Sequence, residues 1–412
     1  MSRPQGRVTV IVSPVHVNGT AALRAFARMG CRTVAVSTDE RAPGLRSRFA
    51  HEKVVLTDAT DAPGWFARWL VSRRDLAGAL VVPTGDEVLA DLHANRAALD
   101  KSFNLSIPPP RACEIALDKA ALYRAAGAAG IPVLRSVDAE GIAEDALGDA
   151  AGLGFPVIVK PRYAIPFQRA FSKKLVVAHS REDLRATLEE CGRLALPVIL
   201  QELLPASGSV ASYSAYVARD GSVAGELTSR RPGIHPPDFG TGFLEVSERI
   251  GPLFKYGRRL IEAAGFSGAL LNLDFKFDER DGRWKLLDMN ARSWRQASLA
   301  AASGINVFEM LLRDCLGRPA RPAPDMRRGR RWLYAKDALY CRRAFGGRAA
   351  PAREFLRFLA GPRAFALFDL SDPRPFVVDI APLVMRRFRR KAPRQDAEGR
   401  PFDGPAQRRH SR

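Results

Sequence analysis

Residues 268–292, GALLNLDFKFDERDGRWKLLDMNAR, contain the pattern that decides the fold. Two largely apolar stretches flank the turn sequence RDG (280–282), so the segment predicts a β-hairpin. We expect Asp274 at the end of the first strand. Asp288 and Asn290 lie two residues apart on the returning strand, so both side chains should point to the same face of the sheet.

These three side chains offer only oxygen as a ligand. Carboxylate and amide oxygens suit a Mg²⁺ ion that is shared with nucleotide phosphates. Burying carboxylates on the apolar strand 285–290 costs free energy unless a cation compensates. The hairpin therefore predicts a metal site. A second interpretation stays open, in which Asp288 is an exposed edge residue and Asn290 forms a turn.

The chain before the hairpin begins with alternating strands and helices. A β-branched run at residues 7–13 is followed by a helical pattern and a second strand. This order predicts a βαβ unit with a parallel sheet. A buried strand within 78–88 carries Thr84, Asp86 and Glu87 at its carboxyl end, where ligands collect in such sheets. The G-x-G-x-x-G pattern of dinucleotide-binding proteins is absent from the sequence.

The middle of the chain predicts a mixed arrangement of strands and helices. An alanine-rich pattern at residues 116–134 favours one helix that stops at a Gly-Ile-Pro sequence. The apolar run 154–162 predicts a buried strand containing Lys160. Residues 212–229 alternate about an Asp-Gly turn and predict a second hairpin. Further strands and helices are expected at 173–179, 197–204, 252–265 and 305–317.

Composition bounds the class of protein. The 412 residues exceed the size of one ordinary domain, and 46% hydrophobic residues are sufficient for buried cores. No run of about 18 uncharged apolar residues and no signal-peptide pattern is present, so we expect a cytoplasmic protein. The five cysteines lack CxxC or CxxH spacing, which indicates neither a zinc site nor a disulfide framework.

Positive charge is concentrated near the C-terminus. Residues 321–412 hold 23 Lys and Arg against 9 Asp and Glu, which is +14 of the total net charge of +20. The cluster RRFRRK (386–391) follows the apolar run 375–385, an arrangement expected of a segment that lies on an anionic membrane surface. Nucleic acid or another polyanion is a further interpretation, and a solvated basic surface packed on the core is the plain alternative.

The pattern D-F-K-x-D-x-x-D-G-x-x-K-L-L-D-x-N-A-R (274–292) resembles the closing motif of the ATP-grasp superfamily. The family usually has Glu where this chain has Asp288. Within the family, RSWRQ (292–296) is similar to the continuation favoured by the branch of carboxylate–amine ligases that includes D-aspartate ligase. The resemblance extends from about residue 7 to residue 315.

This resemblance implies an architecture that combines α/β and α+β parts. It predicts an N-terminal Rossmann-like pre-ATP-grasp domain and an ATP-grasp domain with a small lid, which precede a basic helical C-terminal extension and a disordered tail. The corresponding boundaries are 1–112, 113–318 with the lid at about 125–200, 319–392 and 393–412. The last two segments lie beyond the resemblance and follow from sequence composition, with helices expected around 332–343 and 351–360.

The resemblance also implies roles for residues near the hairpin. Asp274, Asp288 and Asn290 become the ligands of Mg²⁺ or Mn²⁺. Arg292 becomes the cation that meets the acyl phosphate, since a guanidinium offers forked donors to an oxyanion. Asp288 in place of Glu shortens the side chain by one methylene, which puts bidentate bridging of two metals in doubt.

ATP is the cofactor that the resemblance implies. Lys119 and Lys160 would offer point charges to the ATP phosphates, and Lys160 would also act in catalysis. Gln201, Glu202 and Leu204 would form the hinge that binds adenine.

Two features depart from the family pattern. The acidic residue that usually receives the ribose is missing, and 207–209 read Ser-Gly-Ser. The loop after Lys160 lacks the glycines that place backbone N–H groups on phosphate, so Arg169, Lys173 or Lys174 would supply charge instead.

Substrate contacts are expected on the acceptor side. The loop 228–243 resembles the family's loop with paired basic residues, which assigns Arg230 and Arg231 to a substrate carboxylate, together with Arg295. The alternative is a turn-rich loop with solvated cations.

The function that follows from the resemblance is that of an ATP-dependent ligase. It would activate a small-molecule carboxylate as an acyl phosphate and couple it to an amine, or to a thiol. One alternative is an ATP-grasp kinase or synthetase with a non-amine acceptor. Another is a weakly catalytic nucleotide-binding scaffold on membrane or nucleic acid. Whichever function holds, the basic extension would place the protein at the inner face of the membrane. The sequence does not specify an oligomeric state.

Overall fold

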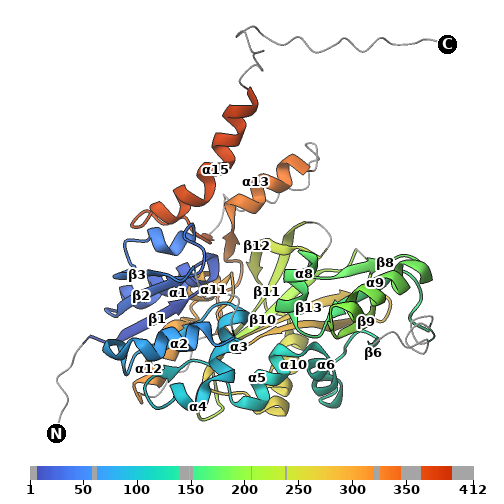
Figure 1. The fold of residues 1–412 in the computed structure, drawn as a ribbon, viewed down its shortest axis with the longest axis horizontal. Helices are drawn as coiled ribbons and strands as arrows, with labels where there is room; N and C mark the ends of the chain where they lie inside the picture. The colour runs from blue at the N-terminus through green and yellow to red at the C-terminus, as the bar shows by residue number, and fades with distance from the viewer. Residues whose placement is uncertain are drawn as a thin grey trace.

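The computed structural model describes residues 7–57, 63–139, 148, 152–205, 207–236, 239–318, 325–344 and 363–391. Over these residues the strands form three sheets, of five, four and seven strands. Figure 1 shows them with the N-terminal unit on the left, the four-stranded sheet on the right and the seven-stranded sheet between them. The arrangement agrees with the predicted combination of α/β and α+β parts.

The N-terminal sheet is parallel, with the order β3-β2-β1-β4-β5. Its three central strands are short, largely apolar runs with side chains such as Ile11 and Val81 fully buried, whereas the two edge strands are partly exposed. Burial on both faces is what a parallel sheet covered by helices requires. The strands are β1 (Thr9–Ser13), β2 (Arg32–Ser37), β3 (Glu52–Val55), β4 (Leu80–Pro83) and β5 (Asn104–Leu105). The helices of this unit are α1 (Val17–Arg28), η1 (Pro43–Arg46), α2 (Trp65–Ser72), η2 (Arg74–Leu76), α3 (Asp86–Ala94) and α4 (Arg96–Leu99).

The helix predicted at 116–134 is present but shorter, and another helix ends directly before it. Asp118 adopts an extended backbone with φ −110° and ψ 111° and separates α5 (Pro110–Leu117) from α6 (Lys119–Ala128). Its carboxylate accepts hydrogen bonds from the backbone N–H groups of Ala120 and Ala121. Asp118 is therefore the N-cap of α6, and Lys119 is the first residue of that helix.

The four-stranded sheet, here called the lid sheet, has the order β6-β9-β7-β8 and is antiparallel. Two helices cover it, and Phe167 and Leu184 from them are fully buried against its strands. The helices are α8 (Ala164–Phe171) and α9 (Arg181–Arg193), and the strands are β6 (Ser136–Ala139), β7 (Val157–Pro161), β8 (Val176–Ala178) and β9 (Val198–Glu202).

The seven-stranded sheet, here called the central sheet, has the order β14-β13-β10-β11-β12-β15-β16. Both predicted hairpins are confirmed, since β10 pairs antiparallel with β11 and β13 with β14. The strand that carries Asp274 continues to Asp278, so Asp274 lies in mid-strand rather than at its end. The strands are β10 (Val210–Val217), β11 (Val223–His235), β12 (Thr241–Ser247), β13 (Ala269–Asp278), β14 (Arg283–Asn290), β15 (Arg331–Leu333) and β16 (Arg363–Phe365). The helices beside it are α10 (Gly251–Ala264), α11 (Ala297–Ala302) and α12 (Val307–Cys315).

The C-terminal segment contributes strands as well as helices. The helix expected at 332–343 begins as strand β15, which extends the central sheet beyond β12, and α13 (Ala335–Ala344) follows it. The last helix, α15 (Arg374–Lys391), leaves the body near β3 (Figure 1). The helix expected at 351–360 and the tail 393–412 lie outside the described residues. No helix within the described ranges is long and apolar enough to cross a membrane.

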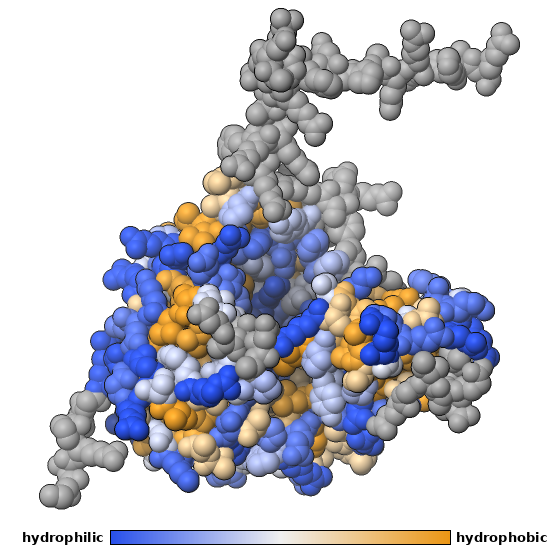
Figure 2. All heavy atoms as spheres, viewed as in Figure 1, coloured by the Kyte–Doolittle hydropathy of each residue, from blue (hydrophilic) through white to orange (hydrophobic). Residues whose placement is uncertain are grey.

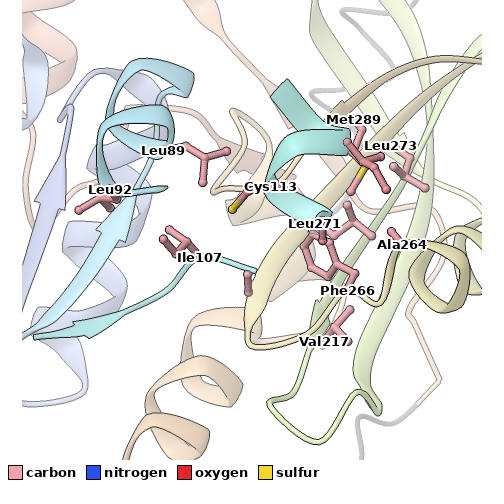
Figure 3. Close-up of a cluster of buried hydrophobic side chains, with 14 of the residues drawn as sticks. Leu89, Leu92, Ile107, Cys113, Val217, Ala264, Phe266, Leu271, Leu273 and Met289 are labelled. Carbon is pink, nitrogen blue, oxygen red and sulfur yellow. The ribbon is translucent and has the colours of Figure 1, made fainter. Parts of the chain in front are cut away.

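One apolar core links the N-terminal sheet to the central sheet. Figure 3 shows Leu89 and Ile107 on one side, Cys113 between, and Leu271 and Phe266 on the other. Because α5 bridges the two sheets in this way, the carboxyl ends of the N-terminal strands are held beside the β13–β14 hairpin.

Candidate active site

A cavity of about 1410 Å³ lies where the three sheets meet. Figure 2 shows this face of the molecule hollowed between the N-terminal unit and the lid sheet. Most of the site residues expected from the sequence line the cavity; those that do not are Glu202, Arg230, Arg169 and Lys173. The cavity is therefore the candidate active site.

The two carboxylates of the hairpin face each other. Asp274 on β13 is directly opposite Asp288 on β14, and the register then shifts so that Phe275 is opposite Leu286. Leu287 is the extra residue of this β-bulge, and beyond it Asp288 and Asn290 share one face of the sheet because they are two residues apart on a strand. Asp288 and Asn290 therefore line the cavity together with Asp274.

The donor set fits a hard divalent cation. Both carboxylates form their hydrogen bonds through Oδ1: Asp274 with Ser212 and Arg231, and Asp288 with Lys119. Among the described contacts Oδ2 of each carboxylate is left for another ligand. Within the same residues no group of three or more His, Cys, Asp or Glu gathers, so the set consists of two carboxylates and one amide. Oxygen-only donors of this kind suit Mg²⁺ or Mn²⁺ and are poor ligands for soft metals.

Two lysines approach the hairpin from different elements. Lys119 Nζ lies 2.6 Å from Asp288 Oδ1. Lys160, on β7, donates to the hydroxyl of Tyr123 at 2.7 Å and to the carbonyl of Leu287 at 2.8 Å. These partners of Lys160 are neutral, so its charge is not cancelled by a directly bonded carboxylate among the described residues.

Burial and neighbouring charges shift the pKa values of Lys160 and Asp288. Burial lowers the pKa of Lys160, and the attraction of Asp288 and Asp274 does not restore it. For Asp288, burial alone would raise the pKa, but Lys119 and Lys160 hold it below its ordinary value. Asp288 is therefore ionised at neutral pH, as a metal ligand must be.

A lysine of the lid lies at the cavity in the segment that was expected to supply charge. The chain after Lys160 forms helix α8. Of the three cations expected to supply charge here, Lys174 lines the cavity, and its ammonium donates to Thr241 of β12 at 3.2 Å. The lid sheet and the central sheet thus touch across the cavity at this point.

The expected adenine end is built mostly from apolar side chains. Gln201 and Leu204 line the cavity. Glu202 is turned away, because its buried carboxylate accepts from the backbone N–H of Arg135 and pairs with Arg280. Only its neighbours can therefore meet a base through their side chains.

The close approach of two strands explains Gly208 at this end. A Cβ atom on Gly208 would lie 2.1 Å from the carbonyl oxygen of Phe277. The sequence Ser-Gly-Ser at 207–209, which lacks the family's ribose acid, thus meets a packing requirement at its centre.

The N-terminal unit supplies an acidic residue that was not assigned to the site from sequence. Asp86, at the first position of α3, forms a two-point ion pair with Arg292, with Nε–Oδ1 at 2.6 Å and Nη2–Oδ2 at 3.0 Å. Nη2 of Arg292 also donates to Asn290 Oδ1 at 2.8 Å. Thr84, Asp86 and Glu87 were noted together at the end of a strand, but only the fold identifies Asp86 as the partner of Arg292.

The adjacent arginines of β11 point in different directions. Arg231 is 9% exposed and bridges Glu245 and Asp274, so it lies against one of the expected metal ligands. Arg230 pairs with Glu248 and lies over the ring of Trp284. Arg230 does not line the cavity and is not placed to bind a substrate there.

Arg295 lines the cavity at the end nearest the C-terminal segment. Its Nη1 lies 2.7 Å from Asp337 Oδ2 on α13. Its guanidinium carbon lies 4.7 Å from the centre of the Tyr334 ring. Neither Asp337 nor Tyr334 was expected from the sequence to have any part in the site.

Comparison with known proteins identifies a curated relative for part of the chain. No family model matches the chain. The D-aspartate ligase of Enterococcus faecium (strain Aus0004) is 26% identical over 173 residues, which are 39% of this chain and 40% of that ligase. The chain thus matches well under half of the length of this curated relative. The predicted resemblance to its branch is confirmed by this match.

Solved structures match a larger part of the chain. The biotin carboxylase domain of Hydrogenobacter thermophilus 2-oxoglutarate carboxylase, in complex with MgADP, ADP and bicarbonate, has a TM-score of 0.63 at 17% identity, over 79% of this chain and 73% of that chain. The N5-carboxyaminoimidazole ribonucleotide synthetase of Thermus thermophilus has a TM-score of 0.56 at 20% identity, over 76% and 80% of the two chains. At these identities the likeness concerns the fold, and it confirms the predicted ATP-grasp architecture.

Proposed function

We propose that the chain, which has the fold of the ATP-dependent ligase structures it matches, is itself an ATP-dependent carboxylate–amine ligase of the ATP-grasp type. One observation carries the proposal: Asp274 and Asp288 face each other in a cavity that Lys119 and Lys160 enter from two other parts of the chain, with Arg292 just beyond the end of β14. Carboxylates that can hold a metal, set among cations that can hold phosphate, are what phosphoryl transfer from a nucleotide requires.

The reaction would proceed in two steps that balance without a redox partner. A carboxylate oxygen of the substrate attacks the γ-phosphorus of ATP, and the bond from that phosphorus to the β–γ bridging oxygen breaks, which gives an acyl phosphate and ADP. The amine nitrogen then attacks the acyl carbon. Phosphate leaves with the bonding electron pair, and the nitrogen gives up a proton.

The residues of the cavity would bind and orient the reactants. Asp274, Asp288 and Asn290 would hold Mg²⁺ or Mn²⁺, which neutralises phosphate charge when bound. Lys119 and Lys160 would bind ATP phosphates, and Arg292, fixed in direction by Asp86, would face the reacting carboxylate. Gln201 and Leu204 would border adenine.

A screen of carboxylate and amine pairs tests the proposal. We expect continuous release of ADP and phosphate only when the carboxylate is present together with the amine, or with hydroxylamine in its place, which should yield the acyl hydroxamate. Asp288→Asn is the inactive control. A stable phosphorylated product without released phosphate would instead identify a kinase, and nucleotide binding without turnover on any pair would indicate a scaffold.

The C-terminal helix supports a second proposal, about location. Val377 and Met385 on α15 are 56% and 58% exposed, and Leu370 before the helix is 87% exposed. The basic cluster 386–391 continues the same helix, although its side chains lie outside those described. Exposed apolar residues followed by cations suit the surface of an anionic membrane. We propose that α15 holds the protein at the inner face of such a membrane.

A further inference from the structure

The C-terminal segment reaches into the cavity wall at Arg295. Asp337 in the first turn of α13 fixes one edge of the Arg295 guanidinium, and the ring of Tyr334 covers one of its faces. Both residues follow the predicted end of the ATP-grasp domain at 318. The direction of a cavity cation is thus set by a part of the chain that the sequence separates from the catalytic domain.

Arg295 is the most accessible of the three arginines that line the cavity. Its side chain is 24% exposed, compared with 13% for Arg292 and 9% for Arg231. Arg231 bridges two carboxylates and Arg292 binds Asp86 at two points. Within the part of the chain that the structure describes, Arg295 has a single ion-pair contact, with Asp337, so more of its N–H donors are left for a ligand.

A second contact seats α13 against the central sheet. The ring of Tyr340 stacks on that of His235, with centroids 5.9 Å apart and planes 3° from parallel. His235 ends β11, next to the start of β12 where Thr241 bonds Lys174. The helix therefore packs on β11 beside the end of the cavity that Lys174 and Arg295 line, although none of its described residues lines the cavity itself.

The position of α13 is secured in turn by α15. Asp379 on α15 accepts from the hydroxyl of Tyr334 at 3.2 Å and from Lys336 Nζ at 2.9 Å. Asp372, just before α15, is buried against Arg24 of the N-terminal unit. Buried, charge-assisted contacts of this kind resist displacement, so the segment joins the N-terminal unit to the wall of the cavity.

We infer that the C-terminal segment completes the substrate site: Arg295 binds an anionic group of the substrate, and Asp337 and Tyr334 are its positioning residues. A guanidinium held at one edge and one face presents its remaining donors in fixed directions, which favours a planar carboxylate. The identity of the substrate in this inference rests on the proposed ligase function, whereas the contacts of Arg295 with Asp337 and Tyr334 are independent of that function.

The test uses malonate, a small dicarboxylate, as the probe. Malonate is titrated by calorimetry into the full-length protein, with and without saturating Mg·ADP. The variants are Asp337→Asn, which keeps the shape and removes the charge, Asp337→Glu, which restores the charge, and Arg295→Gln. Asp138→Asn, in the exposed lid pair of Arg124 and Asp138, is the matched control.

We expect Asp337→Asn and Arg295→Gln to weaken malonate binding about tenfold, the loss of roughly one charge-assisted hydrogen bond. Asp337→Glu should recover most of the affinity, Asp138→Asn should leave it unchanged, and all four variants should bind Mg·ADP as the wild type does. A merely structural defect would lower ADP affinity as well and would not respond to the restored charge.

Two results would overturn the inference: absence of malonate binding to the wild type under both conditions, or equal affinity in the wild type and Asp337→Asn. Failure of the wild type to bind Mg·ADP would instead count against the ligase proposal. The nucleotide-free titration still reports on Arg295 in that case, so the two failures are distinguishable.

Discussion

Lys119 Nζ lies 2.6 Å from Asp288 Oδ1, and this ion pair joins the start of α6 to β14 across 169 positions of sequence. A cation expected to bind phosphate thus occupies an oxygen of a carboxylate expected to bind metal. When the nucleotide is absent, Lys119 and a metal ion compete for Asp288. Nucleotide phosphates give Lys119 another partner, so metal and nucleotide should bind cooperatively.

Lys119→Met should therefore change metal and nucleotide affinity in opposite directions. We expect Mn²⁺ to bind about fivefold more tightly without nucleotide, since loss of a partly buried ion pair removes a competitor worth about 1 kcal/mol, while ATP binds more weakly. Electron paramagnetic resonance of free Mn²⁺ measures the first and calorimetry the second. Lys285→Met, which breaks an ion pair with Asp281 on the same hairpin, should change neither. Weaker Mn²⁺ binding in Lys119→Met would contradict the competition.

Asp288→Asn should remove turnover and leave the fold intact. The amide keeps the size of the side chain but loses the charge that a divalent cation needs, so we expect a fall of at least about 100-fold in ADP formation. Thermal unfolding followed by circular dichroism should show a folded protein. Asp281→Asn, in the exposed turn of the same hairpin, is the control. ADP formation at the wild-type rate would sink the metal assignment of Asp288.

Nucleotide affinity should depend on pH through Lys160. Burial lowers the pKa of this lysine, and a polyphosphate binds its charged form. Affinity for Mg·ATP should therefore be highest below the pKa of Lys160 in the free protein and fall as the pH rises through it, earlier than for an ordinary lysine. Calorimetry from about pH 7 to about pH 10 measures this slope, and Lys160→Ala should bind more weakly with a flatter slope. An identical slope in Lys160→Ala would exclude the role, and the exposed Lys101→Ala serves as control.

The features that were predictable from sequence are those specified by neighbouring residues. The hairpin 268–292 has local alternation and a local turn, so its strands and the shared face of Asp288 and Asn290 follow from the pattern. The helix predicted at 116–134 is present but shorter, because Asp118 is its N-cap and the two residues before Asp118 end α5. Local helix propensity does not reveal that Asp118 also bonds Arg162 of the lid, with Nη2–Oδ2 at 2.6 Å.

Other features depend on contacts between distant segments. Arg292 meets Asp86 across 206 positions, and Arg295 meets Asp337 only because β15 joins the sheet edge at β12. Strands of three residues such as β15 are too short to show a period. The exclusion of Arg230 from the cavity could have been predicted from the sequence. Arg230 is adjacent to Arg231 on a strand, and neighbouring strand residues face opposite sides. One member of such a pair had to leave the cavity.

Charge reversal at the end of α15 tests the membrane proposal. We expect the variant to keep its activity in solution but to lose sedimentation with vesicles that contain phosphatidylserine, since each cation near an anionic surface contributes about 1 kcal/mol. Binding of the wild type should weaken as salt rises. Wild-type protein that shows no salt-sensitive binding to these vesicles would refute the proposal. The reversed residues are Arg386, Arg387, Arg389 and Arg390, and the matched control reverses Arg41, Arg46, Arg111 and Arg318.

Asp372 should contribute more to stability than any exposed ion pair of the chain. It is 1% exposed and accepts from Arg24 Nε at 2.9 Å, from the hydroxyl of Ser47 at 2.6 Å and from the backbone N–H of Arg48 at 2.9 Å. Asp372→Ala leaves the buried charge of Arg24 without its carboxylate, which costs about 3–5 kcal/mol. The free energy of unfolding in urea measures this cost.

The same substitution should release the C-terminal segment before the rest of the protein unfolds. Without Asp372, the segment loses its buried ion pair with the N-terminal unit. Asp379 still bonds Tyr334 and Lys336, but these residues belong to the C-terminal segment itself. Limited proteolysis should therefore cut within 363–391 faster than in the wild type. Asp369→Asn, in the more exposed pair with Arg28, should cost less than about 1 kcal/mol. If Arg295 depends on this anchoring, Asp372→Ala should also weaken malonate binding while the ATP affinity changes little. Unfolding at the wild-type urea concentration, with unchanged cleavage in 363–391, would show that Asp372 does not hold the segment in place.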